Sequence, residues 1–122
     1  MELDDLEIYK LARDIGKDAW EIYNTLNWQD KKIVGDQFIS AIDSIDANIA
    51  EGFGRFHFLD KNKFNYNERG SLLESIYWAK LLFERRKITK EKANILQDKL
   101  SILYLKLNNY INSTKQQVNQ SK

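Results

Sequence analysis

Apolar residues recur along this chain at alternating steps of three and four, a spacing that keeps side chains on one face of an α-helix. The first such series comprises Ile8, Ala12, Ile15, Ala19, Ile22 and Leu26. It predicts a helix that Asp4 or Asp5 is placed to cap at its start. A second series begins near Asp30 and comprises Val34, Phe38, Ala41, Ile45, Asn48 and Gly52, with Ile42, Ile49 and Phe53 beside it. The helix that it predicts ends between Gly52 and Phe56.

Two further helices are predicted after a turn between Arg55 and Asp60, with Asp60 as a candidate N-cap. The inward positions expected on the third helix are Ser71, Glu74, Trp78, Leu81 and Leu82. The basic residues 85–87 suit the carboxyl end of that helix, because the helix dipole is negative there. We expect Thr89 to cap the fourth helix, whose apolar series is Ala93, Leu96, Leu100, Leu103, Leu107 and Tyr110.

Four helices of about 20–28 residues joined by short turns predict an all-α fold, an up-down-up-down antiparallel four-helix bundle. We expect residues 1–111 to form the bundle and the polar segment 112–122 to fray. Composition agrees with long helices, because proline is absent and only 5 glycines interrupt the 122 residues. No stretch approaches the ~18 apolar residues of a membrane span and no secretion signal is evident. A cytoplasmic protein without a membrane partner is therefore expected.

The residue types that are missing narrow the chemistry. Absence of cysteine excludes disulfides, thiolate zinc sites and a cysteine nucleophile. The single histidine, His57, has no co-ligand at metal-binding spacing, and a carboxylate-bridged di-metal bundle needs Glu-x-x-His on two helices. We therefore expect no metal, no cofactor and no catalytic residue.

Charge is divided unevenly along the chain. Residues 1–59 carry 6 basic and 12 acidic side chains, whereas residues 60–122 carry 13 basic and 6 acidic ones, and attraction between these halves favours their pairing. Positive charge gathers at the turn after the third helix, where a possible nucleic-acid contact comprises Lys80, Arg85, Arg86, Lys87, Lys90 and Lys92. The up-down topology puts Trp28, Lys31 and Lys32 at the same end, with Trp28 able to stack an exposed base. The alternative is a charged turn that is only solvated.

Polar residues also follow the helical spacing on the second and third predicted helices. This polar seam comprises Ser44, Asn48, Glu51, Arg55, Asn67, Ser71 and Glu74. A hairpin of the two helices sets Ser44 opposite Ser71, and a hydrogen-bonded seam of this kind fixes helix register. The alternative is a pocket in which Glu51 and Glu74 act as general acid and base.

Apolar residues outside the four core series predict self-association. The candidate oligomer interface comprises Trp20, Tyr23, Ile95, Ile102 and Leu105. A monomeric bundle leaves part of this surface in water, and contiguous exposed apolar surface commonly marks an interface. The alternative is that these residues complete the core of the monomer.

Two short motifs carry a resemblance to a known family. The run Asn48-Ile49-Ala50-Glu51-Gly52, followed by Gly70-Ser71-Leu72-Leu73-Glu74, resembles the four-helix-bundle proteins encoded in intervening sequences of bacterial large-subunit ribosomal RNA genes. The resemblance extends from about residue 6 to residue 89. It implies a bacterial protein without known catalytic activity that assembles as a homopentamer. A related group consists of accessory proteins of diversity-generating retroelements, which contact nucleic acid.

Residues and resemblance together predict a non-enzymatic, self-associating four-helix bundle that serves as a scaffold for RNA or another protein. Two alternatives stay open. One is an enzyme that uses Asn48, Glu51, Ser71 and Glu74 of the polar seam, and the other is a purely protein-binding adaptor.

Overall fold

The structure, a computed structural model, describes residues 2–55 and 58–121, with side-chain surroundings for residues 2–55 and 63–113. Its four long helices are α1 (Glu7–Thr25), α3 (Asp36–Phe53), α4 (Phe58–Glu84) and α5 (Lys90–Ser121). The shorter elements are a 3-10 turn η1 (Leu3–Asp5), α2 (Trp28–Asp30) and a π-helical turn η2 (Lys31–Gly35) that leads directly into α3. The predicted all-α class is confirmed.

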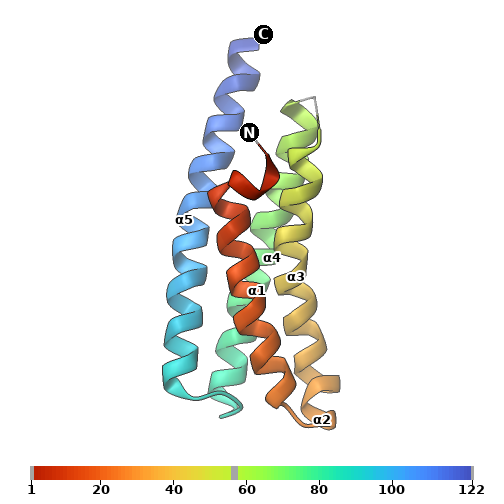
Figure 1. The fold of residues 1–122 in the computed structure, drawn as a ribbon, viewed down its shortest axis with the longest axis vertical. Helices are drawn as coiled ribbons and strands as arrows, with labels where there is room; N and C mark the ends of the chain where they lie inside the picture. Colours follow the sequence, from red (N-terminus) through yellow and green to blue (C-terminus); the bar gives the residue numbers. More distant parts are fainter. Residues whose placement is uncertain (1, 56–57, 122) are drawn as a thin grey trace.

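The long helices lie side by side and alternate in direction (Figure 1). α1 contacts α3 and α5, and α4 contacts the same two helices, so that α1 and α4 lie diagonally across the bundle. Every adjacent pair of helices is therefore antiparallel. This arrangement confirms the predicted up-down-up-down four-helix bundle.

The predicted apolar series are buried in three of the four long helices. All six members of the α1 series are buried, as are the α5 series from Ala93 to Leu107 and most of the α3 series. Phe38, Ile15 and Leu100 are among the side chains with no exposed surface. Burying side chains of this size contributes ~1.5–3 kcal/mol each, so this core supplies most of the stability of the fold.

The predicted inward face of α4 is wrong except at Leu82, which is buried as expected. Ser71, Trp78 and Leu81 are only half-buried and Glu74 is exposed, whereas the buried series is Asn65, Glu68, Leu72, Ser75, Ala79 and Leu82. The two series differ by one residue, which corresponds to a rotation of about 100° around the helix axis. Apolar residues occur on both sides of α4, so their spacing alone does not identify the side that faces the core.

Helix starts depend on local contacts that sequence patterns predict unevenly. Thr89 caps α5 as expected, because its Oγ1 accepts a hydrogen bond from the Lys92 N–H at 3.2 Å. The predicted cap of α1 is wrong. Leu6 is its N-cap, and the Asp5 carboxylate instead accepts a hydrogen bond from the Glu2 N–H within η1. The predicted cap at Asp60 is also wrong, because α4 already begins at Phe58.

The second predicted helix begins two residues earlier than expected. Asn27 caps α2, since its side-chain oxygen accepts a hydrogen bond from the Asp30 N–H at 2.8 Å. The end of α3 at Phe53 agrees with the prediction. α5 continues through the polar segment to Ser121, and fraying of residues 112–122 stays a prediction. Among the described residues, no helix contains an apolar stretch long enough to cross a membrane.

Gly52 allows α3 and α4 to approach closely near their hairpin end. A Cβ at this position would lie 3.0 Å from Phe64 Cβ, and that atom cannot move without its backbone. We expect Gly52→Ala to force the two helices apart and to destabilise the fold by about 1–3 kcal/mol. The matched control is Gly16→Ala, because a Cβ added at Gly16 meets nothing within 4 Å. This control variant should stabilise the fold by about 0.5–1 kcal/mol. Urea denaturation of both variants tests this, and equal effects would contradict it.

Candidate functional site

The α3 members of the polar seam form hydrogen bonds within their own segment. Ser44 Oγ donates to the Ser40 carbonyl at 2.8 Å, and Asn48 Nδ2 donates to the Ser44 carbonyl at 2.7 Å. The Arg55 guanidinium, just beyond α3, donates to the exposed Glu51 carboxylate at 3.5 Å. These bonds satisfy the polar groups locally.

The α4 members of the polar seam are likewise satisfied within α4. Glu74 is exposed and accepts a hydrogen bond from Trp78 Nε1 at 3.1 Å, while the half-buried Ser71 accepts one from Ser75 through its carbonyl. Asn67 is exposed. Among the described residues, no hydrogen bond joins the α3 and α4 members, so a register-setting role for the polar seam stays a prediction. Glu51 and Glu74 are both exposed, and Glu51 lines an open surface hollow, with Arg55, to which Glu74 does not contribute.

A different polar group is buried in α4, and the sequence prediction missed it. Asn65, Glu68 and Ser75 each have at most 1% of their surface exposed. Glu68 Oε2 has no hydrogen-bond partner among the described residues, and burial raises the pKa of Glu68 to about 8. The half-buried Tyr110 of α5 lies close enough for Glu68 to help raise the pKa of its hydroxyl, after burial itself. Glu68 is therefore protonated and neutral at pH 7.

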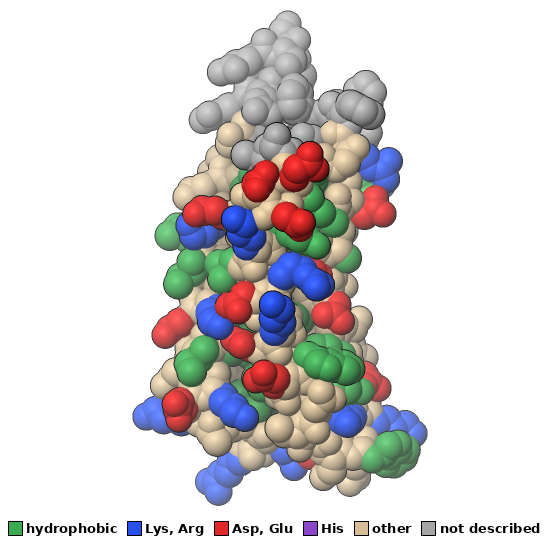
Figure 2. Space-filling view, in the orientation of Figure 1, with side chains coloured by type: hydrophobic (Ala, Val, Ile, Leu, Met, Phe, Trp, Pro, Cys, Tyr) green, Lys and Arg blue, Asp and Glu red, His purple; other side chains and the backbone are tan. Residues whose placement is uncertain are grey.

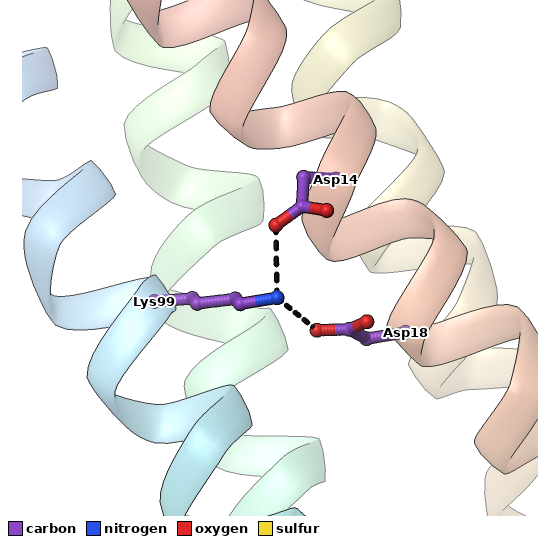
Figure 3. A network of polar contacts seen from close by, with 3 residues as sticks. All are labelled: Asp14, Asp18 and Lys99. Atoms are coloured by element: carbon purple, nitrogen blue, oxygen red, sulfur yellow. Dashed lines mark hydrogen bonds and ion pairs between the residues drawn. The ribbon is translucent and has the colours of Figure 1, made fainter.

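Ion pairs between α1 and α5 join acidic residues of the first half of the chain to basic residues of the second half. Lys99 Nζ lies 2.8 Å from Asp14 and 2.6 Å from Asp18, so one lysine bridges two carboxylates a helical turn apart (Figure 3). These hydrogen bonds raise the pKa of Lys99, that of Asp14 having the larger effect. Nearer the opposite end of α5, Lys106 pairs with Glu7 at 3.1 Å. Acidic residues of the first half thus meet basic residues of the second half, as the charge division predicts.

An ion pair also joins the predicted basic residues of the α4–α5 turn to α2. Lys87 Nζ lies 3.0 Å from Asp30, which fixes the α4–α5 turn beside α2 (Figure 1). Trp28 and Lys32 therefore lie at this end, as expected, with Lys32 Nζ 5.1 Å from the centre of the Trp28 ring. Of the predicted basic set, Lys80, Arg85, Arg86, Lys87, Lys90 and Lys92 are all exposed. We call these residues, with Trp28, Lys31 and Lys32, the basic end, where Figure 2 shows Lys and Arg side chains gathered at the foot of the molecule.

The turn within the basic end has an unusual residue. The Arg86 N–H donates to the Phe83 carbonyl and the Lys87 N–H to the Leu82 carbonyl, both at 2.9 Å, which is the pattern of a Schellman motif. Its central position normally holds glycine because φ is positive there, but here Arg86 adopts φ 59°. An arginine is thus kept at the tip of the turn despite a backbone conformation that favours glycine.

The predicted oligomer interface is mostly exposed but divided between helices. Ile95, Ile102 and Leu105 of α5 and Trp20 of α1 are exposed, whereas Tyr23 is half-buried. The Trp20 and Tyr23 rings stack at 5.4 Å, and the Tyr23 hydroxyl donates to Asp36 Oδ1 at 2.6 Å. Tyr23 therefore also links α1 to the start of α3.

A second exposed apolar face, which the sequence prediction missed, lies on α4. Tyr66, Leu73 and Tyr77 recur at steps of seven and four and are 41%, 50% and 56% exposed. We call these three residues the outer α4 face. It lies roughly opposite the buried Asn65 and Glu68, so α4 exposes three large apolar side chains while two polar side chains share its inward face with Leu72, Ala79 and Leu82. The helical spacing of these residues was visible in the sequence, but which face turned outward was not.

Comparisons with known proteins identify similar sequences and folds. The family model described as 23S rRNA-intervening sequence protein matches residues 4–109. A solved structure of a protein of unknown function from the S23 ribosomal protein family of Bacteroides thetaiotaomicron is similar, with a TM-score of 0.80. It is 21% identical in sequence and the match covers 85% of this chain and 97% of that one, which shows a shared fold. None of the curated proteins matches this chain.

Buried Glu68 makes stability depend on pH. The folded chain holds its proton up to about pH 8, whereas the unfolded chain releases it near the ordinary value of 4.5. The unfolding free energy should therefore fall by about 1.4 kcal/mol per pH unit as the pH rises between these two values. Above the folded-state pKa it should level off. Glu68→Gln should remove this slope, whereas Glu74→Gln, at an exposed position, should leave it unchanged. Urea denaturation at several pH values measures it, and an unchanged slope in Glu68→Gln would contradict the assignment.

Proposed function

The chain belongs to the 23S rRNA-intervening sequence protein family, and on that premise we propose that it is a self-associating scaffold without catalytic activity. The observation that carries this proposal is the exposed apolar surface of α4, on a helix whose buried side also holds polar residues. A helix of an isolated bundle normally directs its apolar side chains to the core and its polar side chains to water. In α4, Glu68 is buried while Leu73 and Tyr77 are exposed. A second copy of the chain packed on the outer α4 face would remove this apolar surface from water.

The location of the remaining apolar surface supports a closed ring. Exposed apolar residues occur on α1 and α5 as well as on α4, and α1 lies diagonally across the bundle from α4. Contacts between two different surfaces repeat from copy to copy and close into a ring when the rotation between copies allows it, whereas a two-fold dimer uses one surface twice. The homopentamer implied by the family resemblance therefore forms part of the proposal, as does the cytoplasmic location expected from the sequence.

Self-association can be tested by placing charge on the outer α4 face. We expect Tyr77→Glu to shift the native mass toward monomer without loss of helical structure, because a buried carboxylate at an interface costs several kcal/mol. Ile102→Glu and Leu105→Glu test the predicted α5 part of the interface in the same way. Gln37→Glu, at an exposed polar position on α3, is the matched control. Native mass spectrometry reads the result, and a wild-type chain that is monomeric at high concentration would overturn the proposal.

A second proposed function, contact with RNA, is favoured by the basic end. Lysines in the middle of the bundle, such as Lys99, are paired with carboxylates of another helix. In contrast, Arg85, Arg86 and Lys90 are exposed and make no ion pair among the described residues. Cations that are free of acidic partners are available to phosphates. The accessory proteins of diversity-generating retroelements, which the resemblance gives as a related group, contact nucleic acid, and this expectation agrees with the same partner.

Charge reversal at the basic end tests RNA contact. We expect Arg85→Glu with Lys90→Glu to weaken binding of RNA and to lower the slope of log K against log salt by about 0.7–0.9 for each phosphate that the protein no longer neutralises. Lys10→Glu with Lys17→Glu changes the net charge equally at exposed positions of α1 and is the matched control. Fluorescence anisotropy at several salt concentrations measures both. Binding that responds equally to the two double variants would indicate a non-specific charge effect and contradict the assignment.

The enzyme alternative predicts a different result. If the polar seam were catalytic, Glu74→Gln would abolish a turnover while the melting temperature stayed unchanged. A purely protein-binding adaptor would instead assemble with a partner while failing to bind RNA in the salt titration above.

A further inference from the structure

Trp28 is the most exposed large apolar side chain in the described part of the molecule, at 75%. It opens α2, where the cap formed by Asn27 orders the chain reversal between α1 and the second long helix. The ring therefore projects from an ordered helical turn rather than from an unstructured loop. The Lys32 ammonium lies over one part of the ring, 5.1 Å from its centre, and most of the ring surface faces water. An ordered aromatic ring with this exposure is available to stack on a planar group.

The cations around Trp28 divide into two groups with different roles. Lys87 pairs with Asp30, and Lys31 lies over the Tyr23 ring at 5.0 Å, so these two lysines are engaged with the protein. Arg85 and Lys90 come from the adjoining α4–α5 turn and are exposed without an ion pair among the described residues. The Lys87–Asp30 pair holds this turn beside α2, so an aromatic platform and free cations share one end of the bundle.

Resting on the proposed contact with RNA, we infer that the basic end binds single-stranded nucleic acid, with an unpaired base stacked on Trp28 and the neighbouring phosphates on Arg85 and Lys90. A stacking platform beside free cations is the arrangement that single-strand-binding proteins use. Duplexes keep their bases stacked on one another and offer an approaching surface mainly phosphates and groove edges. A single strand can therefore supply an unpaired base to stack on the face of the Trp28 ring, whereas a duplex cannot.

An acidic protein segment is the competing partner for the same cations. Carboxylates would satisfy Arg85 and Lys90, but they leave the indole face of Trp28 without a planar partner. A nucleotide supplies the planar base and the anionic phosphate together, which matches both features of the basic end. The observations therefore favour nucleic acid.

The test compares three probes on the full chain: a fluorescein-labelled oligouridine of about 12 nucleotides, long enough to span a typical single-strand site, its duplex with oligoadenosine, and polyglutamate. We expect oligouridine to bind more tightly than the duplex. Trp28→Ala should weaken oligouridine binding at least about fivefold while changing duplex binding less than about twofold, since base stacking on an aromatic residue contributes ~1–3 kcal/mol. Trp28→Tyr keeps an aromatic ring and should retain most of the affinity. Because Trp28 is exposed, both variants should keep the wild-type melting temperature.

The outcomes separate this inference from the proposal on which it rests. Equal binding of duplex and oligouridine, with no effect of Trp28→Ala, would overturn base stacking and leave RNA contact in place. Failure of both nucleic acids to bind would overturn RNA contact itself. Polyglutamate that binds as tightly as oligouridine and is released by Arg85→Glu would instead assign the basic end to an acidic protein partner.

Discussion

Burial of apolar side chains along four helices sets the rotation of every helix about its axis, and with it everything the surface displays. In α1 and α5 the buried series is separated cleanly from polar positions, so the helices turn Asp14, Asp18 and Lys99 toward one another at their shared edge. In α4 the same requirement is met by Leu72, Ala79 and Leu82. The cost is a Glu68 Oε2 without a hydrogen-bond partner among the described residues and apolar residues left in water outside the core.

Electrostatic pairing then acts on a framework that packing has already arranged. Exposed ion pairs each contribute only about 0–1 kcal/mol, so Lys99 and Lys106 do not hold the bundle together. They do reinforce the pairing of α5 with α1 by matching the acidic first half to the basic second half. The positive character of the basic end comes from the local sequence, because residues 80–92 hold six basic side chains against Glu84 and Glu91.

Much of this fold follows from local regularities in the sequence. The series containing Ile15 and Leu100 was predictable because apolar and polar residues alternate there with a single helical period. Thr89 was predictable as a cap because its partner lies three residues away. The rotation of α4 was not predictable, because Leu72 and Leu73 are adjacent and only the neighbouring helices decide which of them is buried. Burial of Glu68 likewise depends on a neighbouring helix, because Gly52 of α3 lies beside its carboxyl group.

Protonated Glu68 also changes what a calorimeter would record for this protein. The formal net charge of +1 counts this carboxyl as ionised, so the folded chain at neutral pH carries one more positive unit than that figure. Melting exposes the group to water, where it gives its proton to the surrounding buffer. The heat of that proton transfer differs between phosphate and amine buffers. Two samples at identical pH would therefore yield different apparent enthalpies for one and the same structural transition.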